Sequence, residues 1–172
     1  MIVFLSGLSG VGKTTTAEAF TARHTQFKHV IASDLIRSAR ASTGPLDYAQ
    51  AEHNQRILLR NFAEIRRNFP GLHVLLDGHM VIETNEGEHV VEDWVIDGLF
   101  VSYFVAIIDD PSRIYSARLT VGRRLLAPNE LKRLQKLEVA QTERQAVRTG
   151  RPFAQVRSGE LKALENILGL AH

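Results

Sequence analysis

The chain of 172 residues contains no cysteine and no long apolar run. Without cysteine there are no disulfides, no cysteine-ligated zinc, no iron–sulfur cluster and no thiol nucleophile. No apolar run approaches the roughly 18 residues of a membrane-spanning helix. The first residues, Met-Ile-Val-Phe-Leu-Ser-Gly, lack the basic segment of a secretory signal. We therefore expect a cytoplasmic protein with no membrane partner.

An excess of positive charge is also nearly absent, because the formal net charge is only +2. This small excess, without a basic stripe interleaved with aromatic residues, argues against nucleic acid as the main partner. The charges are nevertheless segregated: residues 77–110 hold nine acidic residues and no Lys or Arg, whereas residues 112–136 hold seven Lys or Arg and one acid. The two segments are either two solvated faces, or the basic one contacts a polyanion. The sequence leaves the oligomeric state open.

The pattern along the chain alternates short apolar runs with helical periodicity. We predict strands at residues 2–5, 29–32, 73–76, 101–108 and 152–156, and helices at 13–23, 33–41, 48–68, 92–99, 109–119 and from 129 onward. Ser33, Asn129 and Ser158 are candidate helix caps. Residues 79–91 look irregular, and no strong hairpin signal appears. Such alternation predicts one α/β domain over residues 1–172, a three-layer αβα fold with a five-stranded, mostly parallel sheet.

The most informative motif follows the first predicted strand. Residues 7–14, Gly-Leu-Ser-Gly-Val-Gly-Lys-Thr, match G-x-x-x-x-G-K-[ST] at every fixed position. Glycines let the backbone wrap phosphates closely, and the helix that follows adds the positive end of its dipole. Lys13 would contact the β- and γ-phosphates of ATP. The residues predicted to bind the nucleotide are Gly7, Ser9, Gly10, Val11, Gly12, Lys13, Thr14 and Thr15.

A magnesium site is predicted beside this loop. The Thr14 hydroxyl can ligate Mg²⁺, and Asp77 lies at the end of a predicted apolar strand, where a carboxylate that holds the metal or its water belongs. Asp77 could instead be a turn residue preceding Gly78. The phosphate-binding motif favours the metal role, because triphosphate chemistry requires magnesium. We therefore expect ATP and Mg²⁺ as cofactors.

The order of these motifs resembles that of P-loop kinases of small molecules. The phosphate loop, Ser33-Asp34-Leu35-Ile36-Arg37, Leu76-Asp77-Gly78-His79 and an arginine-bearing segment after a strand follow one another. The chain looks closest to archaeal-type adenylate kinases and related AAA-family ATP-binding proteins. In such kinases, arginines after the fourth strand form a lid over the phosphates. The resemblance thus implies a short lid at roughly 119–128 and catalytic roles for Arg118, Arg123 and Arg124 beside Lys13.

The acceptor side departs from the common bacterial adenylate kinases, which follow Asp-Gly with an aromatic residue, a proline and an arginine. This chain has His79-Met80-Val81 at that place. We expect the acceptor in the helical region 33–69, with Asp34, Arg37, Arg56 and His79 as candidate contacts. Asp34 could be a general base for a hydroxyl acceptor, another substrate contact, or an acid that favours the start of its helix.

The predicted activity is transfer of the γ-phosphoryl group of MgATP to a nucleoside monophosphate, as in adenylate kinases. An anionic phosphate acceptor needs cationic clamps such as Arg37 and no base. The first alternative is a kinase of a hydroxyl acceptor, such as a nucleoside, a sugar, a drug or a polynucleotide end, with Asp34 as the base. The second is a regulatory P-loop ATPase that hydrolyses slowly and signals to a protein partner.

Overall fold

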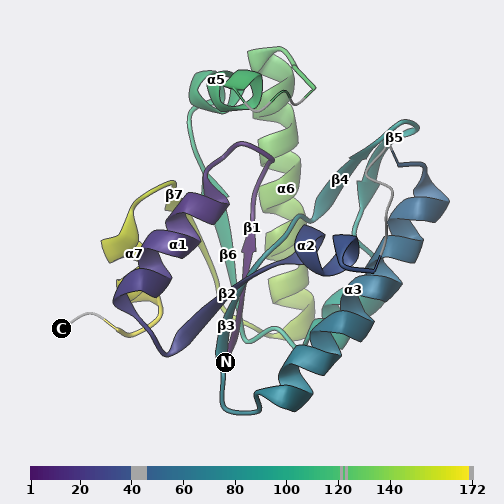
Figure 1. Cartoon of the computed structure of the whole chain (residues 1–172). Coiled ribbons are helices and arrows are strands. Elements are labelled where there is room, and N and C mark those ends of the chain that lie inside the picture. Colours follow the sequence, from purple (N-terminus) through teal and green to yellow (C-terminus); the bar gives the residue numbers. More distant parts are fainter. Residues whose placement is uncertain (40–45, 121, 123, 171–172) are drawn as a thin grey trace.

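The central sheet is parallel throughout and has the strand order β2-β3-β1-β6-β7. Its strands are β1 (Ile2–Ser6), β2 (Phe27–Ile31), β3 (His73–Asp77), β6 (Tyr103–Ile108) and β7 (Phe153–Arg157). The computed structural model describes residues 1–39, 46–120, 122 and 124–170 (Figure 1). The register places Leu5 opposite both Asp77 of β3 and Val105 of β6, so the carboxyl ends of three strands meet at one edge. Parallel sheets place their ligand sites at this edge.

Helices cover both faces of the sheet, which confirms the predicted three-layer α/β fold (Figure 1). They are α1 (Lys13–Arg23), α2 (Ala32–Arg37), α3 (Tyr48–Asn68), α4 (Asp93–Leu99), α5 (Pro111–Thr120), α6 (Pro128–Thr149) and α7 (Leu161–Ile167). The bounds of α3 are those predicted. Its start is fixed by Asp47, whose carboxylate accepts from Gln50 N while the Gln50 side chain accepts from Asp47 N. No helix in the described parts of the chain has the length and apolar character to cross a bilayer.

Alternating strand residues pack into two separate hydrophobic cores, one on each face of the sheet. Phe4, Leu76 and Phe104 point to the face covered by α3, α4 and the end of α6. Their neighbours Leu5, Leu75 and Val105 point to the opposite face, covered by α1, α5, α7 and the first half of α6. Burial on both faces explains why these strands are short continuous apolar runs. The sheet is therefore a rigid base for the loops at its carboxyl edge.

Residues 79–91 are not irregular as predicted, because they contain an antiparallel hairpin. β4 (Val81–Thr84) pairs with β5 (Gly87–Val90) in a separate two-stranded sheet. Glu83 lies directly opposite Glu88 in this pairing. The acidic residues on both strands weaken the apolar alternation by which a strand is usually identified. The hairpin projects beyond the sheet beside the start of α3 (Figure 1).

The three predicted helix caps were each wrong by two positions. Ser33 lies inside α2, whose cap residue is Ile31, and Asn129 is the second residue of α6, which begins at Pro128 after Ala127. Proline suits the first helical position, because its missing N–H would have no partner there. Ser158 precedes α7, whose cap residue is Glu160. Polar residues near a helix start are common, so they locate it only approximately.

Candidate active site

The phosphate-binding loop connects β1 to α1 at the carboxyl edge of the sheet. Gly10 and Gly12 have positive φ angles of 88° and 93°, which side chains of other residues rarely allow. A Cβ on Gly10 would lie 3.1 Å from Cγ of Arg118. Residues 7–12, including Ser9 and Val11, form the loop, and Lys13, Thr14 and Thr15 are the first residues of α1. In this geometry successive backbone N–H groups can surround an anion.

The Lys13 side chain lies folded across this loop and is 6% exposed. Its Nζ donates to the carbonyl oxygens of Gly7 at 2.7 Å and Leu8 at 3.3 Å, and lies 3.7 Å from Asp77 Oδ1. The ammonium group is thus held inside the loop by backbone oxygens and a carboxylate. A triphosphate would provide stronger, anionic partners for the same donor.

Thr14 and Asp77, the two residues predicted to hold magnesium, lie in direct contact. The Thr14 hydroxyl donates to Asp77 Oδ2 at 2.7 Å, and His29 Nε2 lies 3.6 Å from the same oxygen. Burial by itself would raise the pKa of Asp77, but His29, the Lys13 ammonium and the Thr14 hydroxyl outweigh burial and hold that pKa below its ordinary value. His79 adds a smaller effect in the same direction. The carboxylate is therefore ionised at neutral pH.

These two side chains fit magnesium. One hydroxyl and one ionised carboxylate that already lie within hydrogen-bond distance form an oxygen donor pair. Mg²⁺ prefers oxygen ligands and usually takes one or two from the protein, the others coming from water and substrate phosphates. Thr14 and Asp77 would hold the ion, and its positive charge would offset the negative charge of the phosphates during transfer.

Arg118 of α5 lies against the loop, but its side chain is only 2% exposed. Its Nε donates to the Ser9 carbonyl oxygen at 3.0 Å, and its Nη1 donates to the Arg124 carbonyl oxygen at 3.1 Å. The guanidinium also forms an ion pair with Glu83 of the hairpin. Arg118 therefore connects the phosphate loop, the hairpin and the segment between α5 and α6.

The predicted lid at 119–128 overlaps the ends of two helices, because α5 continues to Thr120 and α6 starts at Pro128. Arg124 is exposed, and its backbone carbonyl is the group that contacts Arg118. Arg123 lies outside the described residues. The structure thus brings one of the three predicted arginines, Arg118, directly to the phosphate loop.

Sequence reasoning missed Glu138, a fully buried acid in the middle of α6. Its Oε1 accepts from Gly7 N at 3.0 Å and Met80 N at 2.8 Å, and its Oε2 accepts from Val81 N at 2.8 Å. One carboxylate therefore ties α6 to the phosphate loop and to the segment after Asp77. A signal was present, because Glu138 follows the buried Leu131 by seven residues and thus lies on the apolar stripe of its helix.

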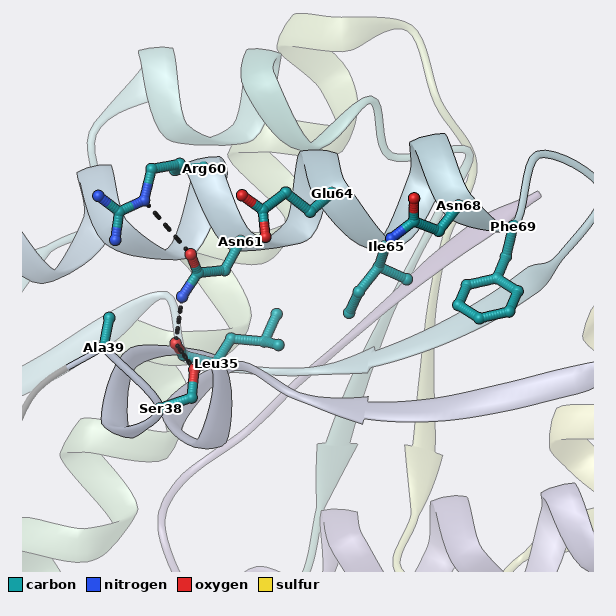
Figure 2. A pocket seen from close by; sticks show the side chains of 9 residues that line it. All are labelled: Leu35, Ser38, Ala39, Arg60, Asn61, Glu64, Ile65, Asn68 and Phe69. Carbon is teal, nitrogen blue, oxygen red and sulfur yellow. Dashed lines mark hydrogen bonds between the residues drawn. The ribbon is translucent and has the colours of Figure 1, made fainter.

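On the acceptor side, Asp34 and Arg37 lie one turn apart on α2 and form an ion pair with each other. Both side chains are 56% exposed. Behind them a groove of about 560 Å³ separates α2 from the second half of α3. Figure 2 shows that Asn61 of α3 crosses this groove and donates to the Leu35 carbonyl oxygen, at 2.7 Å. The predicted acceptor region 33–69 therefore contains both an exposed ion pair and a concave surface.

The two other predicted acceptor contacts lie apart from this pair. Arg56 donates to Glu52 Oε1 at 2.8 Å, and its guanidinium lies over the Trp94 ring of α4, 4.9 Å from the ring centroid. His79 is half-buried directly after Asp77 and Gly78, and its charge affects Asp77. His79 thus lies with the phosphate site, whereas Arg56 is engaged with its own helix and with α4.

Comparison with known proteins gives a family and a fold. Residues 6–135 match the AAA domain family. The solved tunicamycin resistance protein of Deinococcus radiodurans superposes with a TM-score of 0.65 over 99% of this chain and 96% of that chain, at 14% identity. At that identity the likeness is one of fold. No curated protein matches the chain. The matched residues include the whole phosphate loop, Asp77 and Arg118, more than half of the sequence, and the chain therefore belongs to the AAA domain family of P-loop proteins.

Proposed function

We propose that this protein is a kinase that transfers the γ-phosphoryl group of MgATP to a nucleoside monophosphate. The observation that carries the proposal is the cluster of Lys13, Thr14 and Asp77 at the phosphate loop, with the Thr14 hydroxyl 2.7 Å from the Asp77 carboxylate. Lys13 would bind the donor phosphates, and Thr14 with Asp77 would hold magnesium. Phosphoryl transfer needs mainly such positioning and charge neutralisation.

The arrangement of α2 favours a phosphate acceptor over a hydroxyl acceptor. The Asp34 carboxylate is paired with the Arg37 guanidinium at 2.5 Å, so a hydroxyl acceptor would have to compete with that guanidinium for the carboxylate oxygens. A dianionic acceptor would instead displace Asp34 from Arg37 and take the guanidinium as its own clamp. Arg118, held against Ser9, would stabilise the loop that surrounds the donor phosphates.

The test is ADP release in a coupled assay, run with MgATP and a panel of acceptors that includes nucleoside monophosphates, nucleosides and sugars. A nucleoside monophosphate should raise ATP turnover most. If none of the acceptors raises turnover, the kinase proposal is wrong and a regulatory ATPase gains support.

Asp34→Asn separates the two kinase alternatives. With a nucleoside monophosphate as acceptor, the variant should lose at most a few-fold in kcat, because no base is needed. A loss of about 100-fold or more would identify Asp34 as the base for a hydroxyl acceptor. Asp110→Asn is the matched control, since Asp110 is an exposed acid that caps the start of α5 by accepting from Ser112 N.

A further inference from the structure

Gln55 in α3 is a buried amide whose hydrogen-bonding groups are both unused. Its side chain is 2% exposed, and neither Nε2 nor Oε1 has a hydrogen-bond partner among the described residues. Buried side-chain amides in folded proteins nearly always have partners, because losing water without replacing its hydrogen bonds is unfavourable. The exception at Gln55 therefore calls for a partner that the described part of the chain does not supply.

The position of Gln55 places it on the acceptor side of the active site. On α3 it lies one turn from Ala51 and one turn from Leu58, on the stripe that faces the hydrophobic core. That core also contains Ala32, the first residue after β2, and Met80, three residues after Asp77. Gln55 thus lies on the core-facing side of α3, the helix that packs against α2 and against β4 of the hairpin.

Access to this amide depends on the elements that pack against α3. α3 packs against α2 and against β4 of the hairpin. α2 has only six residues and is linked to α3 by the bond from Asn61 to the Leu35 carbonyl, beside the open groove (Figure 2). The groove lining does not include Gln55, so a ligand would reach the amide only by displacing α2 from α3.

The chemistry of the amide selects the ligand class. A primary amide presents a donor and an acceptor side by side, and pairs fully only with a group that offers the complementary pair. A phosphate offers acceptors alone, so it would leave Oε1 unpaired. The edge of a nucleobase offers both, and the bidentate contact of Gln with adenine is a common form of this pairing.

We propose that the Gln55 amide binds the base of the acceptor nucleotide and so makes the site specific for nucleotides over sugar phosphates. This inference rests on the proposed kinase function, because a nucleotide bound at Gln55 is a phosphoryl acceptor only if the protein is a kinase. Binding alone tests it, so turnover is not required.

The experiment compares two buried glutamines, of which Gln145 has hydrogen-bond partners for its side-chain amide and Gln55 has none among the described residues. Gln145 is 1% exposed, but its Nε2 donates to Asp93 Oδ1 at 2.7 Å and its Oε1 accepts from Arg148 Nε at 2.7 Å. Gln55→Met and Gln145→Met each replace an amide by an apolar side chain of similar shape. The affinities of AMP, GMP, CMP, UMP, ribose 5-phosphate and MgATP are measured by calorimetry for both variants and the wild type.

The wild type should bind at least one nucleoside monophosphate about tenfold or more tightly than ribose 5-phosphate. Q55M should lose about 10- to 100-fold of that affinity, with MgATP affinity within twofold of wild type and an unchanged or higher unfolding temperature. Q145M should keep the preference and unfold at a lower temperature, because it breaks two bonds.

The inference is overturned if Q55M keeps the wild-type preference, or if the wild type does not distinguish any of the nucleotides from ribose 5-phosphate. Gln55→Leu serves if Q55M does not fold, and failure of both variants to fold would assign the amide a purely structural role. A nucleotide that binds through Gln55 but does not raise ATP turnover would contradict the kinase proposal and leave the Gln55 site intact.

Discussion

The ion pair between Glu83 and Arg118 gives the sharpest stability prediction, because the hairpin provides its own control. Glu83 and Glu88 face each other across the two strands, and each pairs with an arginine. The Glu83 partner is 2% exposed, whereas the Glu88 partner, Arg133, is 54% exposed. Glu83→Gln and Glu88→Gln therefore make the same chemical change in a buried and in an exposed ion pair.

Removing one member of a buried ion pair typically costs about 3–5 kcal/mol, because the other charge stays buried without its partner. The cost here is reduced, since Glu83 is itself 26% exposed and Arg118 keeps the Ser9 and Arg124 carbonyls. We expect a loss of about 2–3 kcal/mol for E83Q. For a domain of this size, that corresponds to a fall of roughly 6–9 °C in the unfolding midpoint.

The assay is thermal unfolding of both variants and the wild type, followed by circular dichroism at low salt and at high salt. E88Q should unfold within about 2 °C of the wild type, because exposed ion pairs contribute little and are screened by salt. An E83Q midpoint equal to that of E88Q would refute the claim that Arg118 depends on Glu83.

Three further outcomes follow from the same geometry. Glu138→Ala leaves three buried N–H groups without an acceptor, and each should cost roughly 1–3 kcal/mol. The unfolding midpoint of the variant should therefore fall by more than about 10 °C. A smaller fall would show that water replaces the carboxylate. Gly12→Ala should weaken MgATP binding at least about tenfold, measured by calorimetry, because φ is 93° and the new Cβ would collide with the Ser158 hydroxyl. Since the folded-state pKa of Asp77 lies below its ordinary value of 3.8, its charge stabilises the fold above that pH. The difference in unfolding free energy between wild type and Asp77→Asn should therefore stay level from pH 7 to just above 3.8 and shrink as the pH falls below 3.8 toward the lower folded-state pKa, and a difference that stays constant below 3.8 would contradict the pKa direction.

The sequence predicted those parts of the protein that local patterns determine. The phosphate loop is a contiguous motif, and Asp77 ends an apolar strand, so both could be located without the fold. The strands alternate with helices, which limits the sheet to a parallel arrangement. The helix at 48–68 could be predicted because Leu58, Leu59, Phe62 and Ile65 have helical spacing and Phe69-Pro70-Gly71 ends the pattern.

The contacts that hold the site together could not be read from the sequence in the same way. Glu138 lies 131 residues from Gly7, and Arg118 lies 35 residues from Glu83, so no local pattern links the partners. The hairpin that carries Glu83 was not predicted either, because its acidic residues interrupt the apolar alternation that is typical of a strand. Arg118 was expected to have a catalytic role next to the lid, and its buried position followed only from the packing of α5 against the loop.

The central claim is that the loop from β1 to α1 binds a magnesium nucleotide through Lys13. The most direct measurement is a calorimetric titration of the protein with ATP, with and without Mg²⁺, for the wild type, Lys13→Ala and the exposed-lysine control Lys162→Ala. We predict magnesium-dependent binding in the wild type and in K162A, and a loss of at least about tenfold in K13A. Equal affinities for K13A and the wild type, or no binding by the folded wild type, would contradict the account.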